Sequence, residues 1–150
     1  MNYVGLSKYD TANGPGIRVS LFVSGCTLHC KGCFNPDSWK FDAGNELTPE
    51  VENEIIKELN HNWIDGFSLL GGDPFEPEFE LQLSTLLKRI KEETGKNIWC
   101  WTGRRLDKVK NSALIPYIDT LVDGPFIESK KITEEWRGSS NQRIIYLKKI

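Results

Sequence analysis

Cys26-Thr27-Leu28-His29-Cys30-Lys31-Gly32-Cys33 brings three cysteines together within eight residues, and it begins where an apolar run at residues 17–23 has ended in Ser24-Gly25. We call residues 26–33 the cysteine loop. Thiolates spaced C-x3-C-x2-C turn toward a common centre only if the backbone wraps around something, so a metal centre is the first interpretation. The fourth cysteine, Cys100, lies in the apolar run at residues 98–101, where a small buried side chain is the ordinary expectation.

The number of ligands separates the possible metals. Structural zinc takes four protein ligands, usually as one C-x2-C pair answered by a second pair, and this sequence has no second pair. A 4Fe-4S cluster fits Cys26, Cys30 and Cys33 as ligands of three irons, which leaves the fourth iron open for a substrate or cofactor. A zinc knuckle completed by His29 or His61, a disulfide and three unrelated buried thiols are the alternatives. We expect His29 to point outward.

Composition limits the class of protein. The 150 residues are 39% hydrophobic and 11% aromatic, enough for one good core, so we expect one domain over residues 1–150. The net charge of −2, with both signs interspersed, predicts neither nucleic acid nor a membrane surface as a partner. No apolar run approaches the roughly 20 residues that cross a bilayer. Met1-Asn2-Tyr3-Val4 also lacks the features of a secretory signal, so we expect a cytoplasmic protein without a disulfide framework.

Strand and helix patterns alternate along most of the chain. Residues 1–16 are expected to be a lead-in that ends in the turn at residues 13–16. Thr48 and Pro49 resemble an N-cap and first helical residue, and Gly95 resembles a helix C-terminus. The alternation predicts βαβ units and a parallel sheet of α/β class. Strands are expected at residues 17–24, 67–70, 97–101, 120–123 and 144–147, and helices from residue 49, from residue 79 and over residues 106–110.

Loops at the carboxyl ends of parallel strands share one edge of the sheet. The cysteine loop follows the first expected strand and Gly71-Gly72-Asp73-Pro74 follows the second. Trp101-Thr102-Gly103 and Asp123-Gly124-Pro125 follow the third and the fourth. The sequence therefore predicts an active site on this shared rim.

Gly71-Gly72-Asp73-Pro74 has two interpretations of its own. Glycines at the end of a strand let a ligand approach closely, so that backbone amide and carbonyl groups hold an amino-acid head group. An ordinary βα turn, with Asp73 near the N-terminus of the next helix, requires the same residues. Two glycines do not decide between these interpretations by themselves.

Three runs together resemble one protein family. The spacing of the cysteine loop resembles the signature of radical S-adenosylmethionine (SAM) enzymes. Asn13-Gly14-Pro15-Gly16-Ile17-Arg18 resembles the Asp-Gly-Pro-Gly-x-Arg run of enzymes that activate glycyl-radical proteins, with asparagine in place of aspartate. Arg137-Gly138-Ser139-Ser140-Asn141-Gln142-Arg143 resembles a run typical of the activating proteins of anaerobic ribonucleoside-triphosphate reductases.

The resemblance implies a fold and two cofactors. The fold would be a single-domain, open, incomplete (β/α) barrel of the radical SAM type, because five expected strands are too few to close an eight-stranded barrel. Cys26, Cys30 and Cys33 would hold the 4Fe-4S cluster. Gly71, Gly72 and Asp73 would hold the methionine end of SAM in place of the family's Gly-Gly-Glu, and the shorter Asp73 makes the two glycine backbones the more important contacts.

Contacts with the adenine of SAM depart from the family pattern. Many members carry an aromatic residue directly before the third cysteine, where this chain has Gly32 and then Phe34 after the cysteine. Adenine contact would then come from Phe34 or from the backbone around Gly32. Trp101 could contact the nucleoside of SAM, and a position in the hydrophobic core is the alternative.

The resemblance also implies the reaction. An oxidoreductase of this kind would take an electron from a donor such as a flavodoxin and cleave SAM to methionine and a 5′-deoxyadenosyl radical. The protein substrate would be a glycine in the large catalytic subunit of the anaerobic reductase. No catalytic acid or base is expected beyond the cluster and SAM ligands.

Three other functions stay open. They are the activation of another glycyl-radical enzyme such as pyruvate formate-lyase, small-molecule chemistry of the 7-carboxy-7-deazaguanine synthase kind, and a non-catalytic iron–sulfur or zinc module. The run at residues 137–143 argues against the second function. Its two arginines could hold an anion or a partner's chain terminus, and a solvated loop is the plainer alternative.

Overall fold

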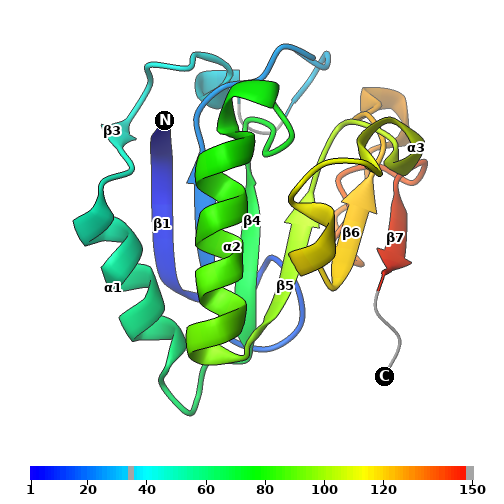
Figure 1. Ribbon diagram of the computed structural model, residues 1–150. Helices are drawn as coiled ribbons and strands as arrows, with labels where there is room; N and C mark the ends of the chain where they lie inside the picture. The colour runs from blue at the N-terminus through cyan, green and yellow to red at the C-terminus, as the bar shows by residue number, and fades with distance from the viewer. Residues whose placement is uncertain (34–35, 148–150) are drawn as a thin grey trace.

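The computed structural model describes residues 1–33 and 36–147 of the chain. These residues form a mixed seven-stranded sheet in the order β3-β1-β2-β4-β5-β6-β7 (Figure 1). The strands are β1 (Asn2–Asp10), β2 (Arg18–Val23), β3 (Asn45–Glu46), β4 (Gly66–Gly71), β5 (Asn97–Trp101), β6 (Thr120–Asp123) and β7 (Arg143–Tyr146). The α-helices are α1 (Pro49–Leu59), α2 (Glu80–Thr94) and α3 (Leu106–Val109). Four 3-10 turns complete the elements: η1 (Pro36–Trp39), η2 (Pro77–Phe79), η3 (Ile115–Tyr117) and η4 (Glu128–Lys130).

The centre of the sheet is parallel, as the sequence predicts. Strand β4 pairs with both β2 and β5, and β6 pairs with β5, so that Leu21, Leu69, Cys100 and Leu121 lie in one row across the strands. The carboxyl ends of these four strands therefore meet at one edge of the sheet. The loops that follow them share the predicted rim.

Both edges of the sheet correct the sequence prediction. Residues 1–16 are not only a lead-in, because β1 pairs antiparallel with β2 over most of its length. Most of β1 is only half-buried, since the two-residue β3 is its single outer neighbour, and its apolar pattern is accordingly weak. Strand β7 is antiparallel to β6 and not part of the parallel order. A parallel return needs a long crossover, usually a helix, and residues 124–142 contain only the turn η4.

Helices α1 and α2 cover one face of the sheet (Figure 1). The side chain of Thr48 accepts a hydrogen bond from the Val51 amide at the start of α1, with proline as the next residue. Helix α2 ends at Gly95, whose φ of 67° is the left-handed conformation that glycine adopts without strain. Apolar residues of both helices pack on the alternate strand residues Val19, Leu21 and Val23 of β2 and their neighbours. Within residues 1–33 and 36–147, no helix combines the length and apolarity needed to cross a membrane.

The opposite face of the sheet carries a buried arginine. Arg18 is fully buried and donates hydrogen bonds to Ser68 Oγ (2.7 Å), Asn97 Oδ1 (2.7 Å) and the carbonyls of Phe67 and Pro15 (3.0 Å each). Burial lowers the pKa of Arg18 to about 10, which is far enough above neutral pH for the guanidinium to stay charged. Arg18 thus links the turn at residues 13–16, through the Pro15 carbonyl, to β4 of the sheet.

Candidate active site

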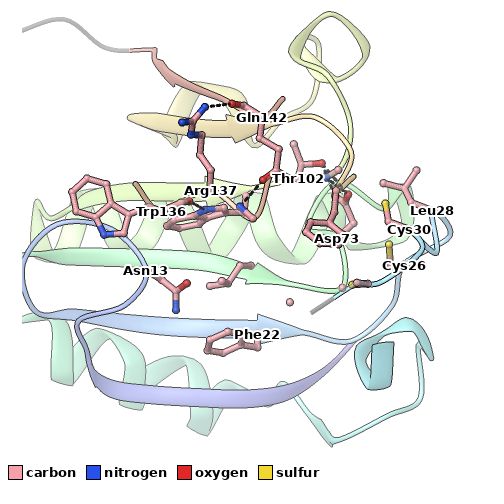
Figure 2. Close-up of a pocket in the computed structure, with 18 of the residues that line it drawn as sticks. Asn13, Phe22, Cys26, Leu28, Cys30, Asp73, Thr102, Trp136, Arg137 and Gln142 are labelled. Carbon is pink, nitrogen blue, oxygen red and sulfur yellow. Dashed lines mark hydrogen bonds between the residues drawn. The ribbon is translucent and has the colours of Figure 1, made fainter. Parts of the chain in front are cut away.

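A cavity of about 780 Å³ lies on the sheet face that α1 and α2 leave uncovered. Phe22, Leu70 and Trp101 line it from β2, β4 and β5, and each alternates along its strand with residues of the core beneath the helices. Figure 2 shows Cys26 and Cys30 at one end of the cavity and Trp136 at the other. The predicted rim is therefore one end of an elongated cavity.

The cysteine loop lies at the rim end of this cavity. The amide of Cys26 donates to the Trp39 carbonyl (3.1 Å), and the amide of Cys33 donates to the Cys30 carbonyl (3.1 Å). All three cysteines line the cavity. His29 is exposed and stacks on Trp39, with ring centroids 4.4 Å apart, which agrees with its expected outward position.

The three thiols are the ligand type that holds an iron–sulfur cluster. Among the described residues, no three His, Cys, Asp or Glu side chains are arranged to hold one ion. A four-iron cube binds each thiolate at a different iron, so its ligands need not meet at one point. Burial raises the pKa of the Cys26 thiol, against opposing hydrogen bonds from the Leu28 and His29 amides. A thiolate at this position therefore gains from a bound cation.

Gly71 and Gly72 line the cavity where β4 ends, and both are packed against the backbone of residues 22–25. The Gly72 amide donates to the Val23 carbonyl (2.7 Å). A Cβ on Gly71 would lie 2.3 Å from the Val23 nitrogen, and one on Gly72 would lie 2.3 Å from the Gly25 carbonyl oxygen. Glycine is thus required here by packing alone, whether or not a ligand also approaches.

The Asp73 carboxylate is fully buried at the edge of the cavity. It accepts hydrogen bonds from the amides of Phe75 and Gly103 (2.9 Å each) and from the Thr102 hydroxyl (2.8 Å). Burial raises the pKa of Asp73, while Arg104 and these hydrogen bonds act in the opposite direction.

The remaining residues predicted to contact SAM differ in whether they line the cavity. Trp101 lines it and donates from its ring nitrogen to the Trp136 carbonyl (2.7 Å). Gly32 is not among the described lining residues, and a Cβ there would lie 2.5 Å from Glu128 Oε2. Phe34 lies outside the described residues.

Sequence reasoning missed the far wall of the cavity, which is formed largely by residues 132–138 and Gln142. Arg137 donates to the carbonyls of Ser140 (3.1 Å) and Gln142 (3.0 Å) and pairs with Glu135. Gln142 accepts from the Gly138 amide (2.7 Å) and donates to the Gly124 carbonyl (2.9 Å). These bonds fold the run at residues 137–143 onto itself and onto the loop after β6.

The second arginine of that run, Arg143, is also already paired. Its Nε donates to Asp123 Oδ1 (2.9 Å). The run is a structured wall and not a solvated loop. No signal in the sequence marks this, because most of the partners are backbone groups. Arg137 Nε is buried without a hydrogen-bond partner in the described structure, so the anion interpretation stays a prediction.

Known proteins resemble the chain over nearly its whole length. The model of the 4Fe-4S single cluster domain family matches residues 12–145. The anaerobic ribonucleoside-triphosphate reductase-activating protein of Vibrio cholerae is 46% identical, over 96% of this chain and 97% of its own. The proteins of the same name from Escherichia coli K12 and from Enterobacteria phage T4 are 42% identical (99% and 100% covered) and 37% identical (96% and 93% covered). The chain therefore belongs to the 4Fe-4S single cluster domain family and to the anaerobic ribonucleoside-triphosphate reductase-activating proteins.

Proposed function

We propose that the chain is a radical SAM activase that forms the glycyl radical on the large catalytic subunit of an anaerobic ribonucleoside-triphosphate reductase. The observation that carries the proposal is that Cys26, Cys30 and Cys33 share one cavity with Gly71 and Gly72 at the end of β4. The cavity volume of about 780 Å³ is in the range of cofactor sites. The relatives are named as activating proteins of the anaerobic reductase, and this name suggests the reductase as the protein substrate.

The residues of the chain bind and orient the cofactors in this proposal. Cys26, Cys30 and Cys33 hold the cluster as thiolates, and the backbone groups of Gly71 and Gly72 that face the cavity hold the methionine end of SAM. When bound, the cluster supplies the electron that cleaves SAM into methionine and a 5′-deoxyadenosyl radical. That electron comes from a one-electron donor such as a flavodoxin.

The apolar lining has its own part in the proposed reaction. Phe22, Leu70 and Trp101 form a wall without ionisable groups, which limits water and side reactions around a radical. Leu28 at the rim end and Trp136 at the far end are both exposed and line the cavity. We propose that the glycine loop of the reductase enters between them.

The proposal extends to the fold and the compartment. One radical SAM domain over residues 1–150, with an open, incomplete (β/α) barrel, agrees with four parallel strands that carry helices on one face and a cavity on the other. An oxygen-sensitive cluster and a reductase partner agree with the cytoplasm.

Glycyl-radical formation tests the proposal. The chain, reconstituted with iron and sulfide without oxygen, would be mixed with SAM, dithionite and the large reductase subunit, with Cys30→Ala as control. We expect the glycyl-radical signal by electron paramagnetic resonance with the unaltered chain only. A signal with pyruvate formate-lyase in place of the reductase, and none with the reductase, would assign the other activase function.

A further inference from the structure

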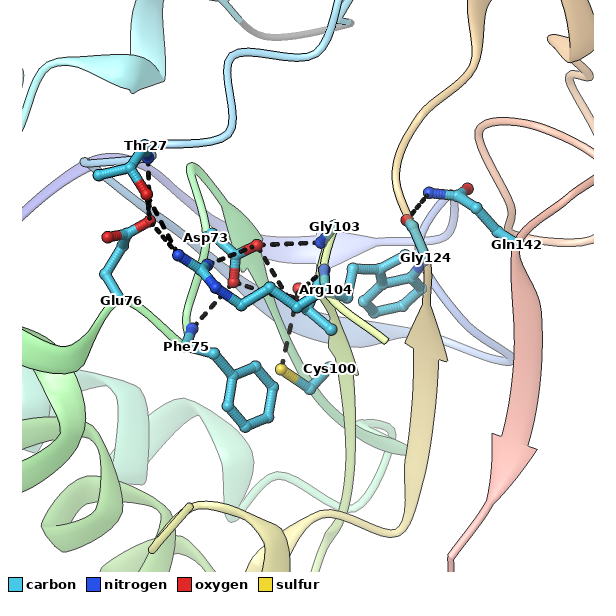
Figure 3. Close-up of polar contacts among 11 residues, drawn as sticks. Thr27, Asp73, Phe75, Glu76, Cys100, Gly103, Arg104, Gly124 and Gln142 are labelled. Carbon is cyan, nitrogen blue, oxygen red and sulfur yellow. Dashed lines mark hydrogen bonds and ion pairs between the residues drawn. The ribbon is translucent and has the colours of Figure 1, made fainter. Parts of the chain in front are cut away.

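A buried charged cluster lies beneath the rim and connects three of its loops (Figure 3). Arg104, in the loop after β5, lies between two carboxylates that follow β4. Its Nη2 is 2.8 Å from Glu76 Oε2, and its Nη1 is 3.1 Å from Asp73 Oδ2. The side chains of Asp73 and Glu76 are only 1% and 3% exposed. Buried carboxylates require such pairing, so removing the guanidinium would leave two unpaired charges.

Glu76 extends this cluster to the cysteine loop. Its Oε2 accepts hydrogen bonds from both the backbone amide and the hydroxyl of Thr27 (2.9 Å each). Arg104 Nη2 also donates to Thr27 Oγ1 (3.2 Å). Thr27 directly follows Cys26, so the first turn of the loop is held in place from outside the loop.

The acceptor sites of Asp73 are taken up within the protein. Its Oδ1 accepts from the Phe75 amide and the Thr102 hydroxyl, and its Oδ2 accepts from the Gly103 amide and faces Arg104. An ionised carboxylate offers about four lone-pair sites. Three groups of the protein donate hydrogen bonds to Asp73, and the Arg104 guanidinium faces Oδ2 at ion-pair distance without a hydrogen bond from Nη1. The carboxylate is thus already neutralised by a cation of the protein, in the place that the ammonium group of a ligand would take.

We infer that Asp73, Glu76 and Arg104 form a positioning network that fixes the cysteine loop at Thr27, and that Asp73 does not bind SAM. Asp73 holds Thr102 and Gly103 in place, and these two residues position Arg104. Arg104 in turn holds Glu76 against Thr27. The inference rests on the proposed cluster site and reassigns the one side chain that was expected to reach the methionine end of SAM. The two glycine backbones then make that contact without Asp73.

The effect of the network on the cysteine loop can be measured without a catalytic assay. The two measurements are the rate of amide exchange at Thr27 and the rate of iron loss. The reconstituted chain would be compared with Glu76→Ala, Arg104→Ala and Asp73→Asn by hydrogen exchange and by the rate of iron release to a chelator. Each change breaks bonds to charged groups, so we expect both rates to rise about tenfold or more. Arg104→Lys should restore part of the protection, because an ammonium group contacts one carboxylate but cannot span two.

Two variants outside the network serve as matched controls. Glu78→Ala removes an exposed carboxylate two residues from Glu76, and Arg89→Ala removes an arginine paired with a glutamate on the surface of α2. Neither variant should change the rate of amide exchange at Thr27 or the rate of iron release. Glu76→Gln, which keeps an acceptor oxygen, replaces Glu76→Ala if the larger change prevents folding.

SAM binding, measured by equilibrium dialysis, separates the inference from its alternative. If Asp73 acts through Arg104, Asp73→Asn and Arg104→Ala weaken SAM binding by similar factors, and the double variant is no worse than either one. Weaker SAM binding in Asp73→Asn with unchanged exchange and iron loss would make Asp73 a SAM ligand and overturn the inference. Unchanged exchange at Thr27 in Arg104→Ala would overturn it as well. Failure of the unaltered chain to cleave SAM would instead count against the proposed function, because the exchange measurement does not depend on catalysis.

Discussion

The amide of Asp73 donates a 2.8 Å hydrogen bond to the carbonyl of Gly25, the residue before the first cysteine of the cysteine loop. The Gly72 amide makes the equivalent bond to Val23. The end of β4 therefore lies directly against the backbone that leads into the cysteine loop. Any change in this contact moves both parts of the proposed site together.

Gly72→Ala should destabilise the protein even without a cofactor. The added Cβ would lie 2.3 Å from the Gly25 carbonyl oxygen, which is backbone and has no side chain to rotate away. Overpacking of this kind costs about 1–3 kcal/mol, to be measured by urea unfolding of the chain. Gly5→Ala is the control, because its Cβ would meet only the Phe22 ring at 3.4 Å. Equal stability of the two variants would contradict the packing role of Gly72.

Replacing the cysteines one at a time should separate the proposed ligands from the core thiol. Cys26→Ala, Cys30→Ala and Cys33→Ala each remove a proposed ligand and should abolish stable uptake of about four irons per chain. Cys100 is fully buried among core residues, so Cys100→Ala should keep the iron and lose about 1 kcal/mol of stability. The measurement is iron and sulfide content after anaerobic reconstitution. Full iron content in any of the first three variants would contradict the assignment.

Asp10→Asn should cost stability at neutral pH and less in acid. Burial raises the pKa of Asp10, but hydrogen bonds from Ser20, Asn13 and the Ala12 amide outweigh it and hold the pKa below its usual value. The ionised carboxylate therefore stabilises the fold above its unfolded pKa of about 3.9, and this stabilisation is lost as the pH falls through the lower folded pKa.

The Asp10→Asn difference can be measured by urea unfolding at pH 7 and pH 3. We expect about 1–2 kcal/mol at pH 7 and a smaller difference at pH 3. Asp37→Asn, at an exposed position, is the control. A difference that stays constant between the two pH values would argue against an ionised Asp10 as the acceptor.

Trp101→Phe should loosen the far wall of the cavity. The ring nitrogen of Trp101 donates to the Trp136 carbonyl, and Glu135 and Trp136 both adopt positive φ, at 62° and 57°. Non-glycine residues hold such angles only where the surroundings enforce them. Loss of this bond should raise amide exchange over residues 132–138, whereas Trp63→Phe, at an exposed position, should not. Unchanged exchange in Trp101→Phe would show that other contacts hold the wall.

The sequence predicted the centre of the fold better than its edges. Strands β2, β4, β5 and β6 are apolar runs because they are largely buried on both faces, and such runs are visible without a structure. Strand β1 is mostly half-buried at a thinly covered edge, so its pattern is too weak to identify. The direction of β7 depends on the lack of a crossover helix, which a single strand pattern does not reveal.

The same contrast holds in the site. The spacing of Cys26, Cys30 and Cys33 predicted that they belong together, and all three line one cavity. The pairing of Asp73 with Arg104 depends on the register of β4 against β5, and 30 residues separate the two in the sequence. The run at residues 137–143 is held largely by hydrogen bonds to backbone carbonyls, and such bonds cannot be recognised from the sequence.

Cleavage of SAM is the most direct test of the central claim. The chain would be reconstituted with iron and sulfide without oxygen, reduced with dithionite in the presence of SAM and the large reductase subunit, and assayed for 5′-deoxyadenosine, with Cys30→Ala in parallel. The account predicts 5′-deoxyadenosine from the unaltered chain and none from Cys30→Ala. A chain that binds about four irons yet forms no 5′-deoxyadenosine with the reductase present, or one that takes up zinc in place of iron, would contradict it.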